Sequence, residues 1–460
     1  MDILVKKQQY KLVDIIFWTA LILFTNPGGI QQTLGIFEII DRINLNDVLF
    51  LVLLFCFLFI KGYKRSEHKD TILLNISILI FLIYYFVVFG FITPQLRETN
   101  VDVVFNLYKL RFALYSSMIF YFSFSFFKRG WSLFLTLFLI SSIVILLLFL
   151  QSFVSGFEIL PYTVFSRGFI DQDRYILLDY GVMPFLTPLG AAVLIFKYKK
   201  KNSKLIILGL ILINLVWLIS LTRRHIMGFV ITFIIGLLIF SYINRSKITQ
   251  YFRVALFSFF MIVIVGLIFP TYVRSGYVLV KSTINVIKTG SNITGLRDER
   301  LALFGREKMV EEFTKHPLLG TGFNNLWRTS EGERYGYEAS DYPFQSALAM
   351  SGILGLLFYL PVYIILIRAL LRDLKTFRAL RASQRNIDQI SVILLGLMIY
   401  FIHTLILYMN WFSPVSNAES VSVFYILLGW YFALREVFYQ NLHTTHFCTD
   451  GKSINNNIEL

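Results

Sequence analysis

Long apolar runs separated by short polar connections occupy most of this 460-residue chain. They lie near Leu12–Thr25, Asp47–Ile60, Thr71–Phe91, Tyr108–Phe127, Trp131–Ser155, Val182–Phe196, Leu205–Leu221, Ile226–Ile243, Val254–Tyr272, Phe344–Leu370, Ile390–Met409 and Val421–Leu434. A helix needs about 20 residues to cross a hydrocarbon layer about 30 Å thick, so the first and sixth runs are short for a span. The pattern predicts an all-α polytopic membrane protein with about 12 transmembrane helices.

Basic residues fall in every second connection between these runs. They are Lys6, Lys7 and Lys11, then Lys61, Lys64, Arg65 and Lys69, then Lys128 and Arg129, then Lys197, Lys199, Lys200, Lys201 and Lys204, then Arg245, Lys247 and Arg253, and finally Arg372, Lys375, Arg378, Arg381 and Arg385. Because Lys and Arg in short loops resist translocation, the alternation predicts a multi-pass protein with both termini in the cytoplasm. The net charge of +15 then reflects orientation and contact with anionic lipid, so no nucleic-acid partner is implied.

The division of the chain follows from this topology. Residues 1–440 form one polytopic helical domain, and residues 273–343 form a large external loop subdomain between the ninth and tenth helices. The polar tail 441–460 is expected to be cytoplasmic and disordered. The basic start and first apolar run lack a small-residue cleavage site, so we expect a retained helix. Cys56 lies in a span and Cys448 in the tail, which gives no disulfide framework.

The external loop contains the main polar segment with a structured pattern. Apolar residues recur at mostly helical spacing over Glu299–Phe313, which predicts a surface helix that His316 and Pro317 end. Gly320 and Gly322 then permit a tight turn. We interpret His316 as a turn residue rather than a catalyst, and the glycines as architectural.

Three segments follow one another in the second half of the chain: Arg300 with Phe304 four residues later, the turn His316-Pro-Leu-Leu-Gly-Thr-Gly-Phe323, and the helix start Ser351-Gly-Ile-Leu-Gly-Leu356. In this order they resemble the O-antigen ligase and polymerase superfamily. Ser220-Leu-Thr-Arg223-Arg224 also stands where that superfamily carries a Ser-Arg pair at an external helix end. The resemblance covers residues 220–360. It differs at one point, because Asp341-Tyr342 stands where many ligases of the superfamily carry a His-Asn pair.

The resemblance implies transfer of a glycan from a polyprenyl diphosphate. The departing diphosphate gains negative charge as the glycosidic bond breaks, and arginine binds phosphate oxygens through its planar fork. We therefore predict Arg223, Arg300 and Asp341 as catalytic residues, with Asp341 as one candidate base; Glu331, Glu333 and Glu338 are equally available. Predicted substrate-binding residues are Arg224, Lys109, Arg111 and His403.

Each of these residues also has a simpler interpretation. Arg223 and Arg224 could anchor a short loop at lipid headgroups, and Lys109 and Arg111 could extend to the same headgroups. Arg300 and Arg306 lie on a solvated loop, and only Arg300 matches the superfamily. His403 could be a buried, hydrogen-bonded histidine or part of the acceptor site.

Metal and cofactor signals are weak in the sequence. We find no cluster of carboxylates, histidines or cysteines at ligand spacing and no nucleotide-binding glycine loop, so neither a metal nor a cofactor is expected. Asp171-Gln-Asp173, followed by Arg174, is interpreted as a solvated turn.

The hypothesis is a metal-independent membrane glycosyltransferase of the Wzy type. It would polymerise undecaprenyl-diphosphate-linked oligosaccharide repeat units of an O-antigen, capsule or exopolysaccharide on the outer face of the bacterial cytoplasmic (inner) membrane. Its partners would be that lipid-linked substrate and membrane lipids, with a chain-length regulator and a flippase as further candidates. One alternative is ligase-type transfer of the finished glycan to a lipid, protein or cell-wall acceptor. The other is a lipid-linked oligosaccharide flippase or other transporter.

Overall fold

The computed structural model describes residues 12–27, 30–33, 38–40, 43–59, 68–88, 92, 103–155, 164–169, 172–177, 181–199, 202–220, 223–244, 310–311, 313–320, 343–382, 388–407 and 418–449. This part of the chain is predominantly helical, as predicted. Its helices are α1 Leu12–Phe24, α2 Ile30–Thr33, α3 Leu45–Phe59, α4 Lys69–Val87, α6 Val103–Ser155, η3 Met183–Phe185, α7 Leu186–Ile195, α8 Ser203–Ser220, α9 Arg223–Asn244, α14 Pro343–Ala382, α15 Gln389–Leu407 and α16 Ala418–Thr449. Each predicted apolar run falls on one of these except Val254–Tyr272, which lies outside the described residues.

Two short antiparallel hairpins were not predicted. Strands β1 (Glu38–Ile40) and β2 (Ile43–Asn44) form the first, and β3 (Val164–Phe169) and β4 (Gln172–Leu177) form the second. The last two residues of the Asp171-Gln-Asp173 segment belong to β4, where Gln172 pairs with Phe169 and Asp173 with Gly168. Short strands of mixed polarity leave no apolar run, which is why the hydrophobic pattern missed them.

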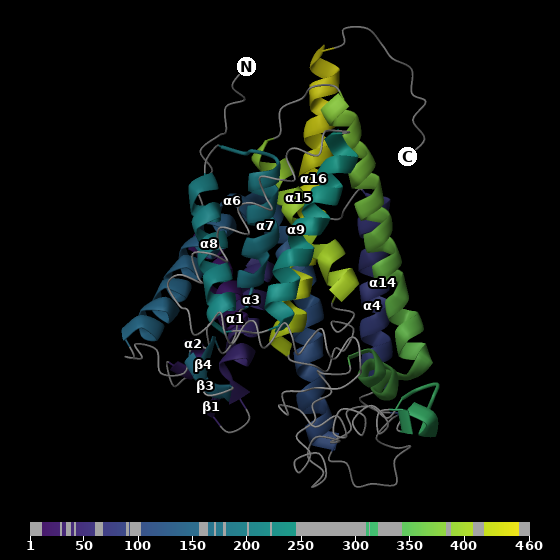
Figure 1. Ribbon diagram of the computed structural model, residues 1–460. Helices are drawn as coiled ribbons and strands as arrows, with labels where there is room; N and C mark the ends of the chain where they lie inside the picture. The colour runs from purple at the N-terminus through teal and green to yellow at the C-terminus, as the bar shows by residue number, and fades with distance from the viewer. Residues whose placement is uncertain are drawn as a thin grey trace, which may run out of the picture.

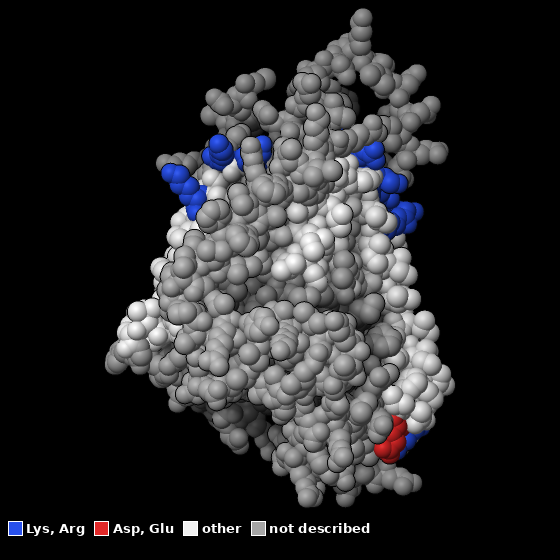
Figure 2. Space-filling model, in the orientation of Figure 1, with Lys and Arg blue, Asp and Glu red and all other residues white. Residues whose placement is uncertain are grey.

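The helices lie side by side in a bundle with two distinguishable ends (Figure 1). At one end the Arg378 guanidinium lies 4.9 Å from the centre of the Tyr242 ring, and an ion pair joins Lys128 to Glu436. We call this the basic end, because the Lys and Arg side chains visible in Figure 2 gather mainly around it. The opposite end contains the starts of α3, α9 and α14. We call it the motif end, because Arg223-Arg224 and Ser351–Leu356, two of the segments that carry the resemblance, lie near the starts of α9 and α14.

The core is built around α16 and α15. Trp430 of α16 stacks on Phe127 with ring centroids 5.1 Å apart and meets Phe134 edge-on at 4.9 Å. Tyr400 of α15 meets Phe185, the last residue of the short helix η3. These large rings fill the space where several helices converge.

Helix α6 covers two predicted spans without an intervening loop, yet it does not run straight. The rings of Phe127 and Phe134 have centroids 4.9 Å apart. Seven residues of straight helix would separate their Cα atoms by about 10.5 Å along the axis. The two limbs of α6 diverge from the basic end in Figure 1. At the bend, a Cβ atom added to Gly130 would lie 2.7 Å from Nε1 of Trp18, so this glycine lets α1 approach closely.

Large apolar side chains face outward at helical spacing on several helices. On α14 these are Leu357, Leu360, Ile364, Ile367 and Leu371, and on α6 they are Ile140, Val144 and Leu147. Among the described residues, the segments Gly130–Ser155 and Ser351–Leu380 are long and apolar enough to cross a membrane. The shorter apolar helices are Leu12–Phe24, Leu45–Phe59, Met183–Ile195, Ser203–Trp217, Gly228–Ile243 and Gln389–Leu405.

Candidate functional site

Helix α14 is interrupted near its start by Gly352. Its dihedral angles, φ 63° and ψ −174°, fall in a region that residues with a side chain essentially do not adopt. A Cβ atom at this position would lie 2.2 Å from the carbonyl oxygen of Leu318. The break therefore requires glycine for its backbone angles and also for the close approach of a second segment.

The second segment is the turn at residues 316–320, which we call the docking turn. Residues 310–311 and 313–315 are helical, the helix ends before His316 as predicted, and the Gly320 amide donates to the His316 carbonyl oxygen at 2.8 Å. The amide of Ile353 donates to the carbonyl oxygen of Pro317 at 2.9 Å, and that of Leu354 to Leu318 at 3.1 Å. The break at Gly352 releases these two amides from helical pairing, and the docking turn satisfies them.

Helix α4 supports this joint from the other side. The hydroxyl group of Tyr84 donates to the carbonyl oxygen of Ser351 at 3.2 Å, and its ring stacks on Phe358. The joint between two segments 36 residues apart in sequence is thus held by a third element. The architectural roles predicted for His316, Gly320 and Gly352 agree with this geometry.

Arg111 lies at the motif end beside a carboxylate. Its Nη1 atom is 3.2 Å from Oδ2 of Asp47 on α3. The same carboxylate oxygen accepts a hydrogen bond from the Asn44 amide at 2.8 Å, which caps the start of α3. Arg111 therefore has a protein partner that the sequence did not indicate, and its predicted contact with substrate stays a prediction.

The backbone places three more predicted site residues at the motif end. Arg223 and Arg224 are the first two residues of α9, and Lys109 lies two residues before Arg111 in α6. Tyr242, near the end of α9, meets Arg378, near the end of α14, at the basic end. Both helices therefore start toward the motif end. The side chains of Lys109, Arg223 and Arg224 lie outside the described residues.

The remaining predicted residues divide into two groups. His403 is half-buried in the last two turns of α15, and Thr404 beside it is buried. Arg300 and Asp341 lie outside the described residues, although α14 begins two residues after Asp341. Within the described ranges, no group of three or more His, Cys, Asp or Glu side chains is arranged to hold a metal ion.

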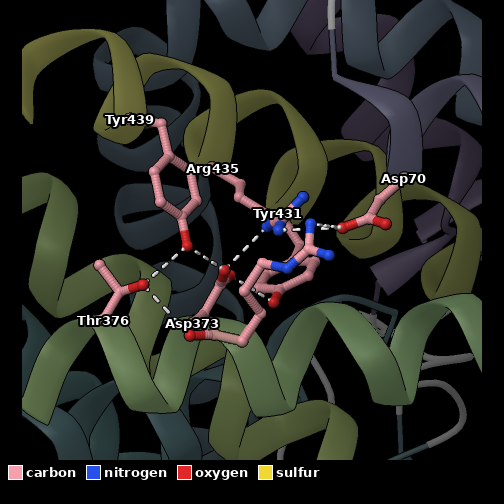
Figure 3. Close-up of polar contacts among 7 residues, drawn as sticks. Asp70, Asp373, Thr376, Tyr431, Arg435 and Tyr439 are labelled. Atoms are coloured by element: carbon pink, nitrogen blue, oxygen red, sulfur yellow. Dashed lines mark hydrogen bonds and ion pairs between the residues drawn. The ribbon is translucent and has the colours of Figure 1, made fainter. Parts of the chain in front are cut away.

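A buried polar cluster at the basic end was missed by the sequence analysis (Figure 3). Arg435 of α16 is 1% exposed and lies between two acids, with Nε 2.8 Å from Oδ1 of Asp373 and Nη2 3.1 Å from Oδ2 of Asp70. Arg372 of α14 also pairs with Asp70, at 2.9 Å. The signal in the sequence is the adjacent pair Arg372-Asp373, of which the topology argument uses only Arg372.

Tyrosine hydroxyl groups complete this cluster, which we call the charge cluster. Tyr431 donates to Oδ2 of Asp373 at 2.6 Å, and Tyr439 donates to Oδ1 at 2.8 Å. The hydroxyl group of Thr376 lies 3.0 Å from that of Tyr439. Half-buried His68 lies beside Tyr439, and burial together with the charge of Arg435 lowers the pKa of this histidine. The cluster ties α4, α14 and α16 together.

Comparison with known proteins finds no matching family model, no similar curated protein and no similar solved structure.

Proposed function

We propose that this protein is a membrane glycosyltransferase that polymerises undecaprenyl-diphosphate-linked repeat units on the outer face of the bacterial cytoplasmic membrane. The observation that carries the proposal is the joint between the docking turn and Gly352. It joins two of the segments on which the resemblance to the O-antigen ligase and polymerase superfamily rests. Under the proposed function, the joint would hold the docking turn of the external loop against α14, the helix that follows this loop.

The described surface supports the proposal of a membrane protein. Outward-facing rows of Leu, Ile, Val and Phe on α3, α4, α6 and α14 suit contact with acyl chains, whereas such rows on a soluble protein would favour aggregation. The basic end suits the cytoplasmic side, because positively charged helix ends stay there. The motif end then faces outward, where lipid-linked repeat units are expected.

The proposed reaction is a substitution at the anomeric carbon next to the diphosphate. A hydroxyl oxygen of the acceptor sugar attacks this carbon, the bond between it and the phosphate oxygen breaks, and the diphosphate leaves with the bonding electron pair. Arg223 and Arg300 would neutralise the leaving group, and Arg224, Lys109 and Arg111 would bind the same phosphates or neighbouring lipid headgroups. The acceptor proton would pass to Asp341 or to another external carboxylate.

A transporter accounts less well for the described charges. Transporters place ionisable residues near the bilayer midplane. Here the buried Asp70, Asp373 and Arg435 form ion pairs near the basic end. Two further buried acids are also paired, Glu436 with Lys128 at the basic end and Asp47 with Arg111 at the motif end. This arrangement favours a fixed scaffold over a carrier, so the flippase stays the weaker proposal.

The test is a reconstitution of purified protein with lipid-linked repeat units. A ladder of products without any other acceptor supports polymerisation. Transfer to an added second acceptor without a ladder supports the ligase instead, and absence of any transfer contradicts both enzymes.

Arginine variants test the proposed leaving-group chemistry. Removing one preorganised donor to developing charge costs about 100-fold or more in rate, so we expect that loss in Arg223→Ala and Arg300→Ala. Arg306→Ala is the matched control, because Arg306 belongs to the same predicted loop as Arg300 but stands outside the superfamily pattern. Normal polymer from stably inserted Arg223→Ala and Arg300→Ala proteins would overturn the diphosphate assignment.

A further inference from the structure

Helix α14 connects the two ends of the molecule. Within its range Pro343–Ala382, the backbone departs from helical dihedral angles at Gly352, and it stays helical across Pro361, which lies between Gly352 and Asp373. With a rise of 1.5 Å per residue, the stretch from Gly352 to Asp373 is about 30 Å long. A displacement of α14 at the charge cluster would therefore be transmitted along the helix to the docking turn.

The contacts that hold α14 differ in how strictly they fix its position along its axis. Apolar contacts such as Phe377 with Phe438 are non-directional and tolerate small sliding. Asp373 is different, because it accepts from Tyr431, Arg435 and Tyr439, which are spaced four residues apart on one face of α16. Hydrogen bonds weaken steeply with distance and angle, so these three donors define one axial position for α14.

The charges in the cluster are balanced. Asp70 and Asp373 face Arg372 and Arg435, and the nearby pair Lys128 and Glu436 joins α6 to α16. A buried charge that loses its partner is strongly unfavourable, so sliding α14 away from α16 is resisted electrostatically as well as geometrically.

We infer that Asp373 and Arg435 are positioning residues: they set the axial position of α14 and so the docking of residues 316–320 on Gly352, about 30 Å away. The relevance to catalysis rests on the proposed function, whereas the mechanical coupling does not. The simpler alternative is that the cluster contributes only to stability.

The coupling can be measured without substrate by disulfide trapping at the motif end. Leu318→Cys and Ile353→Cys place two thiols on the contacting segments, and both side chains are exposed. Cys56 and Cys448 are first replaced by serine, so that the two introduced thiols are the only ones in the protein. The rate of disulfide formation then reports how often the docking turn is seated.

The decisive variant is Asp373→Asn with Arg435→Gln, which removes one charge of each sign and leaves Asp70 paired with Arg372. We expect its trapping rate to fall about 5-fold or more, the lower end of typical coupling between sites. The matched control is Lys128→Gln with Glu436→Gln, which removes an ion pair between α6 and α16 at the same end. We expect trapping in this control to remain at the parental rate.

Three outcomes separate the possibilities. Equal trapping rates in both double variants would overturn the positioning role and leave a stability role. If the decisive variant fails to insert, Tyr431→Phe with Tyr439→Phe takes its place, because it removes two donors to Asp373. Its trapping rate is compared with that of the same control. A selective fall in trapping with no glycan transfer by the parent protein would uphold the coupling and reject the proposed function.

Discussion

The backbone amide of Ile353 donates to the carbonyl oxygen of Pro317 at 2.9 Å, and this bond joins two segments that the sequence keeps 36 positions apart. Neither group belongs to a side chain. The contact therefore depends on backbone geometry at one residue, Gly352, rather than on the chemistry of the residues that make it.

Gly352→Ala is expected to undock the turn. The added Cβ would clash with the Leu318 carbonyl oxygen at 2.2 Å, and the backbone angles would cost about 1–3 kcal/mol more than for glycine. We expect disulfide trapping between Leu318→Cys and Ile353→Cys to be nearly abolished, and polymer formation with it. Gly209→Ala in α8 is the control, because the atom nearest to its Cβ is a terminal methyl carbon of Leu186, at 3.0 Å, and a side chain can give way where a backbone carbonyl cannot. Parental trapping in Gly352→Ala would contradict the joint.

Tyr431→Phe should destabilise the protein more than Tyr425→Phe does. Tyr431 donates to the buried carboxylate of Asp373 at 2.6 Å, whereas Tyr425 donates to the neutral hydroxyl oxygen of Tyr359 at 3.2 Å. Hydrogen bonds to charged groups contribute about 1.5–3 kcal/mol and neutral ones about 0.5–1.5 kcal/mol. Thermal unfolding of the two variants in one detergent measures the difference, and equal shifts would show that Asp373 does not depend on this donor.

Gly130→Ala should destabilise the protein through Trp18. Its Cβ would lie 2.7 Å from the indole nitrogen, so either the bend in α6 or the position of α1 must shift. Trp18→Leu alone leaves a cavity, but in the double variant the smaller side chain makes room for the new methyl group. A double-mutant cycle should therefore give a coupling of about 0.5–3 kcal/mol in favour of the double variant. Strictly additive effects would mean that the two residues do not meet.

The ion pair of Arg111 and Asp47 allows its structural and proposed binding roles to be separated. Arg111→Gln alone leaves a largely buried carboxylate, whereas Arg111→Gln with Asp47→Asn leaves no charge, so the double variant should regain most of the lost thermal stability. If Arg111 also binds the diphosphate, polymer formation stays low in that stable double variant. Full recovery of polymer formation would assign Arg111 to the scaffold alone.

His68 should make stability fall in mild acid. Burial and then Arg435 lower the pKa of His68 from its ordinary value of 6.5, while Asp70, Asp373 and Glu436 oppose this. The unfolded chain then takes up a proton at a higher pH than the folded protein, so stability is lost as pH falls below about 6.5. His68→Phe should reduce the loss of melting temperature between about pH 7.5 and about pH 5.5. An identical loss in the variant would assign the effect to the carboxylates.

The positions of the helices could be predicted because each apolar run is long and bounded by polar residues. The bend of α6 could not, since Lys128 and Arg129 mark a chain reversal without showing that helical structure continues through it. The β3–β4 hairpin was missed for a related reason, because its strands mix Arg, Ser and Asp with Phe and Ile.

The candidate site was predictable only in part. The order of the glycine segments indicated a shared structural purpose, but the pairing of Ile353 with Pro317 is a backbone contact that leaves no trace in residue type. Asp47 and Asp373 were overlooked because each stands at the edge of an apolar run, where a single acid resembles an ordinary solvated helix end. Only burial distinguishes them, and burial depends on which helix lies alongside.

The glycine at position 352 also bears on how such chains can diverge. A backbone joint that excludes every side chain does not depend on the residues around it. Under the proposed function, the residues that contact a glycan could therefore be exchanged while the joint is kept. A search built on this glycine pattern would therefore gather proteins that share a way of attaching an external loop. Differences in specificity among them would have to be sought in the loop residues that the joint carries.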